Sequence, residues 1–155
     1  MNFKHLQKLL KQAFTSSLHY SMATVHKDGT PHVTPIGSFM LVDENNGIYF
    51  EKYTVQMPKN FEHSRQVCIM GVNSSRLFWL ISLILGRFYD HPAVRIYGLV
   101  GEKRKATSEE KKRFEKRVGP VFIFEGARKL WKHMDYVREV KIERVETVKI
   151  ADMTP

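Results

Sequence analysis

The residues best suited to bind a ligand form a polar loop in the first half of the chain, Glu51-Lys52-Tyr53-Thr54-Val55-Gln56-Met57-Pro58-Lys59-Asn60. The loop follows a short apolar segment and ends where a helical turn can begin. Its lysine, tyrosine and threonine side chains supply hydrogen-bond donors, and the first turn of a helix supplies unpaired backbone amides. A loop of this composition can hold a phosphate group.

Other kinds of site are poorly supported by the sequence. The seven histidines form neither an HExxH motif nor an i, i+4 pair, and the single cysteine excludes a cysteine-rich zinc site, so no metal site is predicted. Cys68 lies in an apolar segment, where the pKa of a thiol rises and its thiolate fraction falls. No G-x-S-x-G motif of a serine hydrolase occurs. The sequence identifies no catalytic residue, and it therefore favours a protein whose chemistry is supplied by a bound cofactor.

The elements around the polar loop are typical of a β-meander. Asp28-Gly29 lies between two β-favouring segments and predicts a two-residue hairpin turn. A second turn over 43–47 separates two further apolar segments, and later strands are expected over 94–102 and from Tyr136 onward. We therefore predict one mainly β domain over residues 1–155, a partly open antiparallel barrel with peripheral helices.

Helices are predicted on the outside of this barrel, at about 3–14, about 75–88 and 107–118, with a short one between 120 and 134. The segment 77–85 is apolar nearly all round, yet it is too short to cross a bilayer. It is expected to be buried in the core or in a dimer contact. The alternative is that it walls the substrate pocket or touches an apolar partner.

Four pieces of the sequence resemble the pyridoxamine 5'-phosphate oxidase-like family of FMN-binding split barrels. They are the hairpin 28–37, the strand and hydroxyl-bearing loop 48–54, the pair Lys59-Asn60 and the apolar strand 67–72. Their order and spacing both fit the family pattern, and together they cover about a third of the chain. The resemblance implies an antiparallel Greek-key split barrel of the FMN-binding type.

The resemblance also implies a function, that of an FMN-dependent oxidoreductase acting on a small-molecule substrate as a homodimer. The strand residues expected along the isoalloxazine ring are Val33, Thr34, Pro35 and Ile36. The residues expected at the ribityl chain and phosphate are Glu51, Lys52, Tyr53, Thr54, Lys59 and Asn60. A phosphate with a charge of about −2 suits Lys59 as a point charge and Thr54 as a hydroxyl donor. The sequence departs from the family pattern at Val55 and Met57, where small or hydroxyl residues are common.

Two other classes stay open. A split barrel can bind a deazaflavin or haem instead of FMN, and His63, His91 or His133 would be the candidate axial ligands for haem. The chain can also be a binding or regulatory module that keeps the barrel without turnover. The absorbance spectrum of the purified protein separates these classes.

The formal net charge of +9 favours an acidic ligand. The densest basic residues, between 103 and 117, alternate with glutamates as on a solvated helix, and no nucleic-acid-binding motif accompanies them. Nucleic-acid binding and a transmembrane segment are therefore not expected. The single cysteine and the lack of an apolar signal segment near Met1 indicate a cytoplasmic protein.

Overall fold

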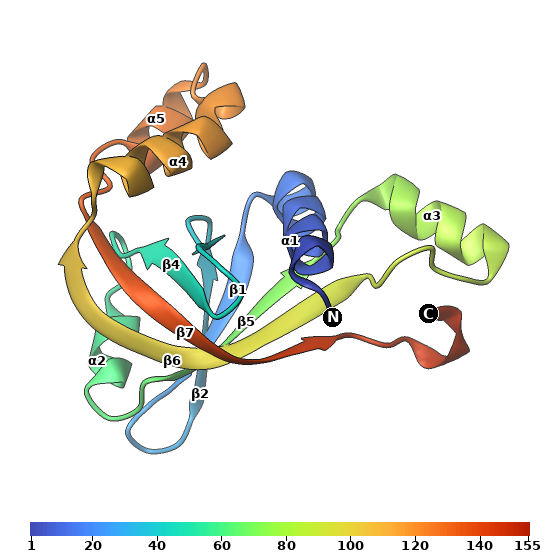
Figure 1. Ribbon diagram of the computed structural model, residues 1–155, viewed down its shortest axis with the longest axis horizontal. Coiled ribbons are helices and arrows are strands. Elements are labelled where there is room, and N and C mark those ends of the chain that lie inside the picture. The colour runs from blue at the N-terminus through green and yellow to red at the C-terminus, as the bar shows by residue number, and fades with distance from the viewer.

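The computed structural model describes residues 1–155, and its centre is one seven-stranded antiparallel sheet (Figure 1). The strand order across the sheet is β2-β1-β5-β6-β7-β4-β3. The strands are β1 (Tyr20–Val25), β2 (Pro31–Ile36), β3 (Met40–Leu41), β4 (Asn46–Phe50), β5 (Gln66–Val72), β6 (Ala93–Lys105) and β7 (Tyr136–Thr147). The prediction of a mainly β, antiparallel fold is confirmed.

Five α-helices surround the sheet: α1 (Phe3–Ser17), α2 (Gln56–Phe61), α3 (Arg76–Leu85), α4 (Ser108–Val118) and α5 (Glu125–Trp131). Short 3₁₀ turns follow α4 at Gly119–Val121 and β7 at Ala151–Met153. Helix α1 packs on β5 and β6 through apolar residues at helical spacing, Leu6, Leu9, Leu10, Ala13 and Phe14. Helix α4 begins with the capping box of Thr107 and Glu110. None of the helices combines the length and the hydropathy needed to cross a membrane.

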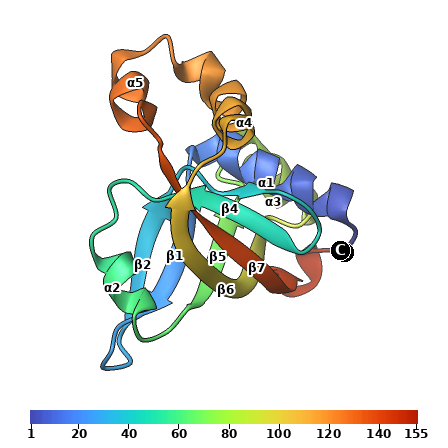
Figure 2. The same cartoon turned by 60° about the vertical axis from the view of Figure 1, so that its left-hand side comes forward.

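The two longest strands, β6 and β7, curve together and carry the sheet from one end of the molecule to the other (Figures 1 and 2). Their pairing shifts register at Tyr97/Gly98 and again between Val100 and Lys103. Such irregularities bend a strand pair, and this bending lets an open sheet close toward a barrel. Strands β1, β2 and β5 form one wall, and β4 and β7 form the facing wall (Figure 2).

At the first register shift, β6 and β7 approach so closely that only glycine fits at position 98. A Cβ atom at this position would lie 2.4 Å from the carbonyl oxygen of Lys141 on β7. We therefore expect Gly98→Ala to lower the free energy of unfolding by about 1–3 kcal/mol, as overpacking does. Chemical denaturation measures this difference. Gly101→Ala on the same strand is the control, since its Cβ would meet nothing closer than 3.7 Å, and an equal loss in both variants would contradict the steric explanation.

The prediction of a two-residue turn at Asp28-Gly29 is wrong. The loop spans residues 26–30, and the amide of His26 donates to the carbonyl of Thr30 (2.9 Å). A two-residue turn of the type predicted needs two residues with positive φ, but only Gly29 has one (86°). The Asp28 carboxylate instead accepts from the amide of Thr30 (3.0 Å) and supports the wider loop.

Helix α3 does not lie in the core of the chain. Ser82 is its only buried residue, whereas Leu77 and Ile84 are 64% and 73% exposed. The helix projects from one end of the molecule, beside the 3₁₀ turn after β7 (Figure 1). The expectation of core burial for this segment is therefore wrong, and its apolar surface faces outward.

Candidate functional site

A pocket of about 300 Å³ lies where β2 ends, between the loop that follows β4 and helix α5. We call it the Thr54 pocket. The residues lining it are Leu18, His19, Pro35, Ile36, Gly37, Ser38, Phe50, Lys52, Tyr53, Thr54, Leu130, Trp131 and Met134. Five of the residues predicted to bind the cofactor thus come together here: Pro35, Ile36, Lys52, Tyr53 and Thr54. Its apolar and aromatic lining with a few polar groups is typical of small-molecule sites.

The hydroxyl of Thr54 has no hydrogen-bond partner in the protein, although it is buried. A buried hydroxyl normally finds a partner, because leaving it unpaired costs about 1–3 kcal/mol. An unpaired group in a pocket wall is therefore a natural contact for a bound ligand. Thr54 is the residue of the predicted set whose environment most needs one.

Lys52 and Tyr53 connect the polar loop to helix α5. The ammonium of Lys52 donates to the carbonyl of Lys132 (2.5 Å), and the hydroxyl of Tyr53 donates to the carbonyl of Lys129 (2.9 Å). Both carbonyls lie at the C-terminal end of α5, where helix carbonyls lack partners within the helix. The two side chains thereby position the α5 wall of the Thr54 pocket.

Trp131 is the aromatic residue that α5 contributes to this wall. Its ring packs edge-to-face on Phe114 of α4, with ring centres 6.2 Å apart. Sequence reasoning missed Trp131 and Met134, because the chain brings them to the pocket from about 80 residues beyond the polar loop. The sequence shows the aromatic character of Trp131 but contains no signal for this contact.

Glu51 is buried away from the pocket. Its carboxylate pairs with Arg138 (2.5 Å) and with Lys103 (3.1 Å), which come from β7 and β6. The hydroxyl of Tyr49 also lies 3.4 Å from this carboxylate. Burial and the negative charge of Glu51 together raise the pKa of Tyr49. The contacts of Glu51 therefore join strands, and Glu51 does not line the Thr54 pocket.

Lys59 and Asn60 line a different pocket, between α2 and the hairpin loop, which we call the hairpin pocket. It is open, measures about 760 Å³ and has no apolar residue; its lining is His26, Lys27, Asp28, Thr30, Gln56, Lys59, Asn60, Glu62 and His63. Asn60 is buried and donates to the hydroxyl of Thr24 (2.8 Å), so it fixes α2 to β1. Lys59 is exposed and forms no ion pair.

Strand β2 joins the two pockets. Its N-terminal end follows Thr30 of the hairpin pocket, and its C-terminal end contributes Pro35 and Ile36 to the Thr54 pocket. Val33 and Thr34 lie between the pockets and line neither; Val33 is 61% exposed, and Thr34 lies 3.5 Å from the ring of His32. At about 3.3 Å per residue, the five steps from Thr30 to Pro35 span roughly 17 Å.

Cys68 is half-buried on β5, and burial raises the pKa of its thiol. A raised pKa lowers the thiolate fraction near neutral pH, which makes the thiol a poor nucleophile. The environment of Cys68 therefore does not activate its thiol.

Comparison with known families now identifies the class of protein. The family described as pyridoxamine 5'-phosphate oxidase matches residues 6–149, which is nearly the whole chain. The chain belongs to this family, and the resemblance inferred from the hairpin and polar loop is confirmed. A search of the curated proteins found no match to the sequence.

Solved structures show the same fold. An FMN-binding protein from Syntrophomonas wolfei subsp. wolfei has a TM-score of 0.65 at 11% identity, over 95% of this chain and 88% of that one. HupZ of Group A Streptococcus has a TM-score of 0.61 at 19% identity, over 96% and 94% of the two chains. HutZ of Vibrio cholerae, described as a heme storage protein, has a TM-score of 0.54 at 15% identity, over 92% and 94%. The FMN-binding split barrel predicted from the sequence is thus the fold of this chain.

Proposed function

We propose that this protein binds FMN in the Thr54 pocket and along β2, and that it is an oxidoreductase acting on a small molecule. The observation that carries the proposal is the buried, unpaired hydroxyl of Thr54 in a pocket with an aromatic wall. Membership of the pyridoxamine 5'-phosphate oxidase family and the shared fold of an FMN-binding protein support it. Bound FMN would supply hydride or electron transfer, which the side chains of the chain do not provide.

Each part of the candidate site suits a different part of such a ligand. Pro35, Ile36 and Trp131 offer apolar and aromatic surface to a planar ring. Thr54 offers a hydroxyl that can donate a hydrogen bond. Lys59, beyond the other end of β2, offers a free ammonium for a phosphate, so an elongated ligand along Val33 and Thr34 would reach both pockets.

The first test is the identity and the binding of the cofactor. Protein produced in cells with ample flavin is expected to release FMN on heating, identified by chromatography.

Thr54→Val keeps the shape of the side chain and removes its hydroxyl, and we expect FMN binding to weaken about two- to tenfold, which corresponds to one lost hydrogen bond. The thermal stability of the cofactor-free variant should not fall, since the hydroxyl bonds nothing in the protein. Release of a deazaflavin, of haem or of no cofactor would overturn the FMN proposal.

Haem is the second candidate, and one structural observation favours it. His133 lines a pocket of about 290 Å³ together with Phe114, Phe122 and Trp131, and a histidine beside apolar rings is a common haem environment. His63 is less suitable, because the hairpin pocket has no apolar lining. A Soret band in the purified protein that His133→Ala abolishes would favour this candidate over FMN.

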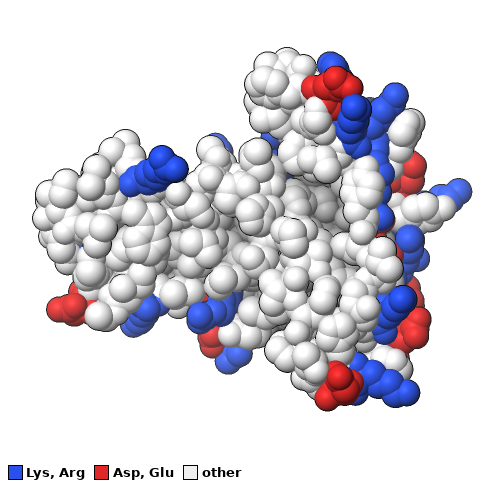
Figure 3. All heavy atoms as spheres, turned by 180° about the vertical axis from the view of Figure 1, so that it is seen from behind, with Lys and Arg blue, Asp and Glu red and all other residues white.

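We also propose that the protein is a homodimer. Monomers rarely expose large apolar patches, yet Leu77, Leu83 and Ile84 on α3 are all largely exposed. Seen from behind, charged side chains gather at the edges, while the middle of this face and much of the lobe around α3 are uncharged (Figure 3). A second copy of the chain can cover such a surface.

Light scattering at micromolar concentration is expected to give twice the mass of one chain. Ile84→Glu should shift the protein toward the monomer, because a charge in the contact would lose its hydration. Lys112→Glu, which places the same charge on the exposed face of α4, should remain dimeric. A monomer mass for the unmodified protein would contradict the proposal.

A further inference from the structure

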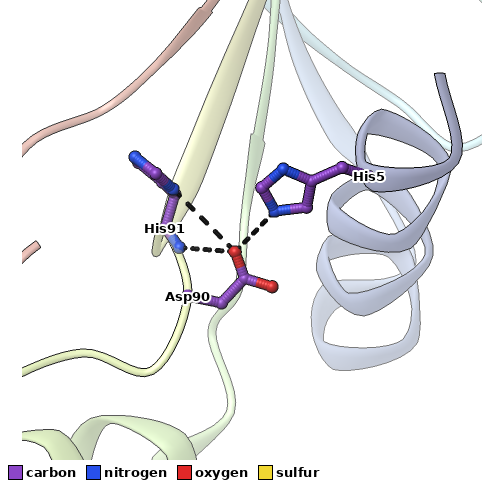
Figure 4. Close-up of side chains that lie close together, drawn as sticks. All are labelled: His5, Asp90 and His91. Carbon is purple, nitrogen blue, oxygen red and sulfur yellow. Dashed lines mark hydrogen bonds and ion pairs between the residues drawn. The ribbon is translucent and has the colours of Figure 1, made fainter. Parts of the chain in front are cut away.

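A second cluster of reactive side chains lies where α1 meets the segment before β6 (Figure 4). It consists of His5 of α1 and the neighbours Asp90 and His91. The Nε2 atom of His5 lies 2.7 Å from Oδ1 of Asp90, and Nδ1 of His91 lies 3.9 Å from the same oxygen. All three of these atoms lie within 4.8 Å of one another.

The His91 ring nitrogen provides an independent reason to expect a ligand. Its Nδ1 atom is buried and has no hydrogen-bond partner, because the Asp90 oxygen at 3.9 Å is beyond hydrogen-bonding distance. A buried polar nitrogen without a partner is costly. The nitrogen points toward the carboxylate that already contacts His5 (Figure 4). A group bound between the three residues would satisfy it.

We propose that His5, Asp90 and His91 bind a divalent transition-metal ion of the Zn²⁺ class. Two imidazoles and one carboxylate are a common ligand set for zinc, with a water or another ligand in the fourth position. Tetrahedral ligands at zinc-ligand distances lie about 3.4 Å apart. The two histidine–aspartate separations of 2.7 and 3.9 Å lie on either side of this value. The ligand nitrogens of His5 and His91 lie within 4.8 Å of each other, so side-chain rotations that bring the three ligand atoms to similar separations would complete the site.

The surroundings orient the carboxylate for this role. Lys8 donates to Oδ2 of Asp90 (2.6 Å), and the backbone amide of His91 donates to Oδ1 (2.9 Å). Binding of the metal replaces the hydrogen bond between His5 and Asp90 with bonds from both side chains to the ion, and the ring nitrogen of His5 that binds the ion must then carry no proton. The ammonium of Lys8 also places a positive charge near the bound ion, and repulsion between these two positive charges opposes metal binding.

The metal would join two parts of the chain that are far apart in sequence. His5 lies on α1, whereas Asp90 and His91 lead into β6 through Pro92. Metal bonds between the two segments hold α1 on the sheet and raise the stability of the folded state by mass action. The alternative is that the cluster is only an ion pair between α1 and this segment, with no affinity for metal.

The experiment titrates the chelator-stripped full chain with Zn²⁺ and measures both heat of binding and melting temperature. The unmodified protein should bind one ion and melt at a higher temperature with Zn²⁺. His91→Gln and His5→Gln should each weaken binding by more than about tenfold, since even the loss of an outer-shell partner can have this effect. Lys8→Gln should tighten the binding of Zn²⁺, because it removes a positive charge near the ion. If the cluster were only an ion pair between α1 and Asp90, the same substitution would weaken that pair and would not produce Zn²⁺ binding.

Two controls keep the result decisive. In the absence of metal, His91→Gln should melt close to the unmodified protein, because Nδ1 of His91 makes no hydrogen bond that the variant would lose. The double variant His26→Gln/His32→Gln removes the other close pair of histidines, whose ring centres lie 5.3 Å apart, and it should bind Zn²⁺ normally. The proposal is overturned if the unmodified protein does not bind Zn²⁺, if His91→Gln binds equally well, or if only the double variant loses binding.

Discussion

Lys59→Met is expected to weaken FMN binding about ten- to hundredfold. Lys59 is exposed, forms no ion pair and lies in the hairpin pocket, so its ammonium is free to contact a phosphate. A hydrogen bond to a charged group contributes about 1.5–3 kcal/mol, which corresponds to this range of affinity. Fluorescence titration of the cofactor-free protein with FMN measures the change.

Riboflavin and a neighbouring lysine provide the controls for Lys59. Riboflavin lacks the phosphate, so its affinity should be nearly the same in both proteins. Lys27→Met removes a second positive charge from the same pocket and should cause a smaller loss if Lys59 makes the direct contact. Equal losses for FMN and riboflavin would indicate a damaged fold, and an unchanged FMN affinity would show that Lys59 is a surface residue only.

Arg138→Met should lower the free energy of unfolding by about 3 kcal/mol, near the lower end of the range for breaking a buried ion pair. The substitution leaves the carboxylate of Glu51 buried without its main partner, because the two side chains are paired at 2.5 Å and both residues are less than 10% exposed. Lys103, at 3.1 Å from Glu51, offers partial compensation. Denaturation in urea or guanidinium measures the loss.

A second variant separates the charge effect from packing. Glu51→Gln/Arg138→Met removes the buried charges together and should be less destabilised than the sum of the two single variants. Arg65→Met breaks the exposed pair with Glu102 and should change stability by no more than about 1 kcal/mol. If Arg138→Met were as mild as Arg65→Met, the buried pair would not be important for the fold.

The sequence by itself determined the class of fold and much of its local structure. Period-two alternation and turn residues are local signals that predicted the antiparallel meander, and a capping-box motif predicted the start of α4. Family membership was predicted from the resemblance of four sequence segments to a known family pattern. Local signals were less reliable for geometry. The Asp28-Gly29 pair correctly marked a hairpin. A two-residue turn would have required a positive φ at both residues, and because only Gly29 has one, the loop is wider.

The division of the candidate site was decided only by the tertiary structure. Glu51, Thr54 and Lys59 are close in sequence, yet Glu51 points to Arg138, Thr54 points into its pocket and Lys59 belongs to the hairpin pocket. Strand alternation and the turn into α2 send neighbouring side chains in different directions. Sequence distance therefore could not show which of them share a ligand.

Contacts between distant segments were also beyond the reach of the sequence. Trp131 reaches the Thr54 pocket from α5, and His5 on α1 meets Asp90 and His91 in the segment before β6. A search for histidines at short spacing could not find this cluster, because its members are separated by 85 positions. Spacing along one helix or strand is set by local geometry, whereas these contacts depend on how α1 and the curved strands β6 and β7 pack together.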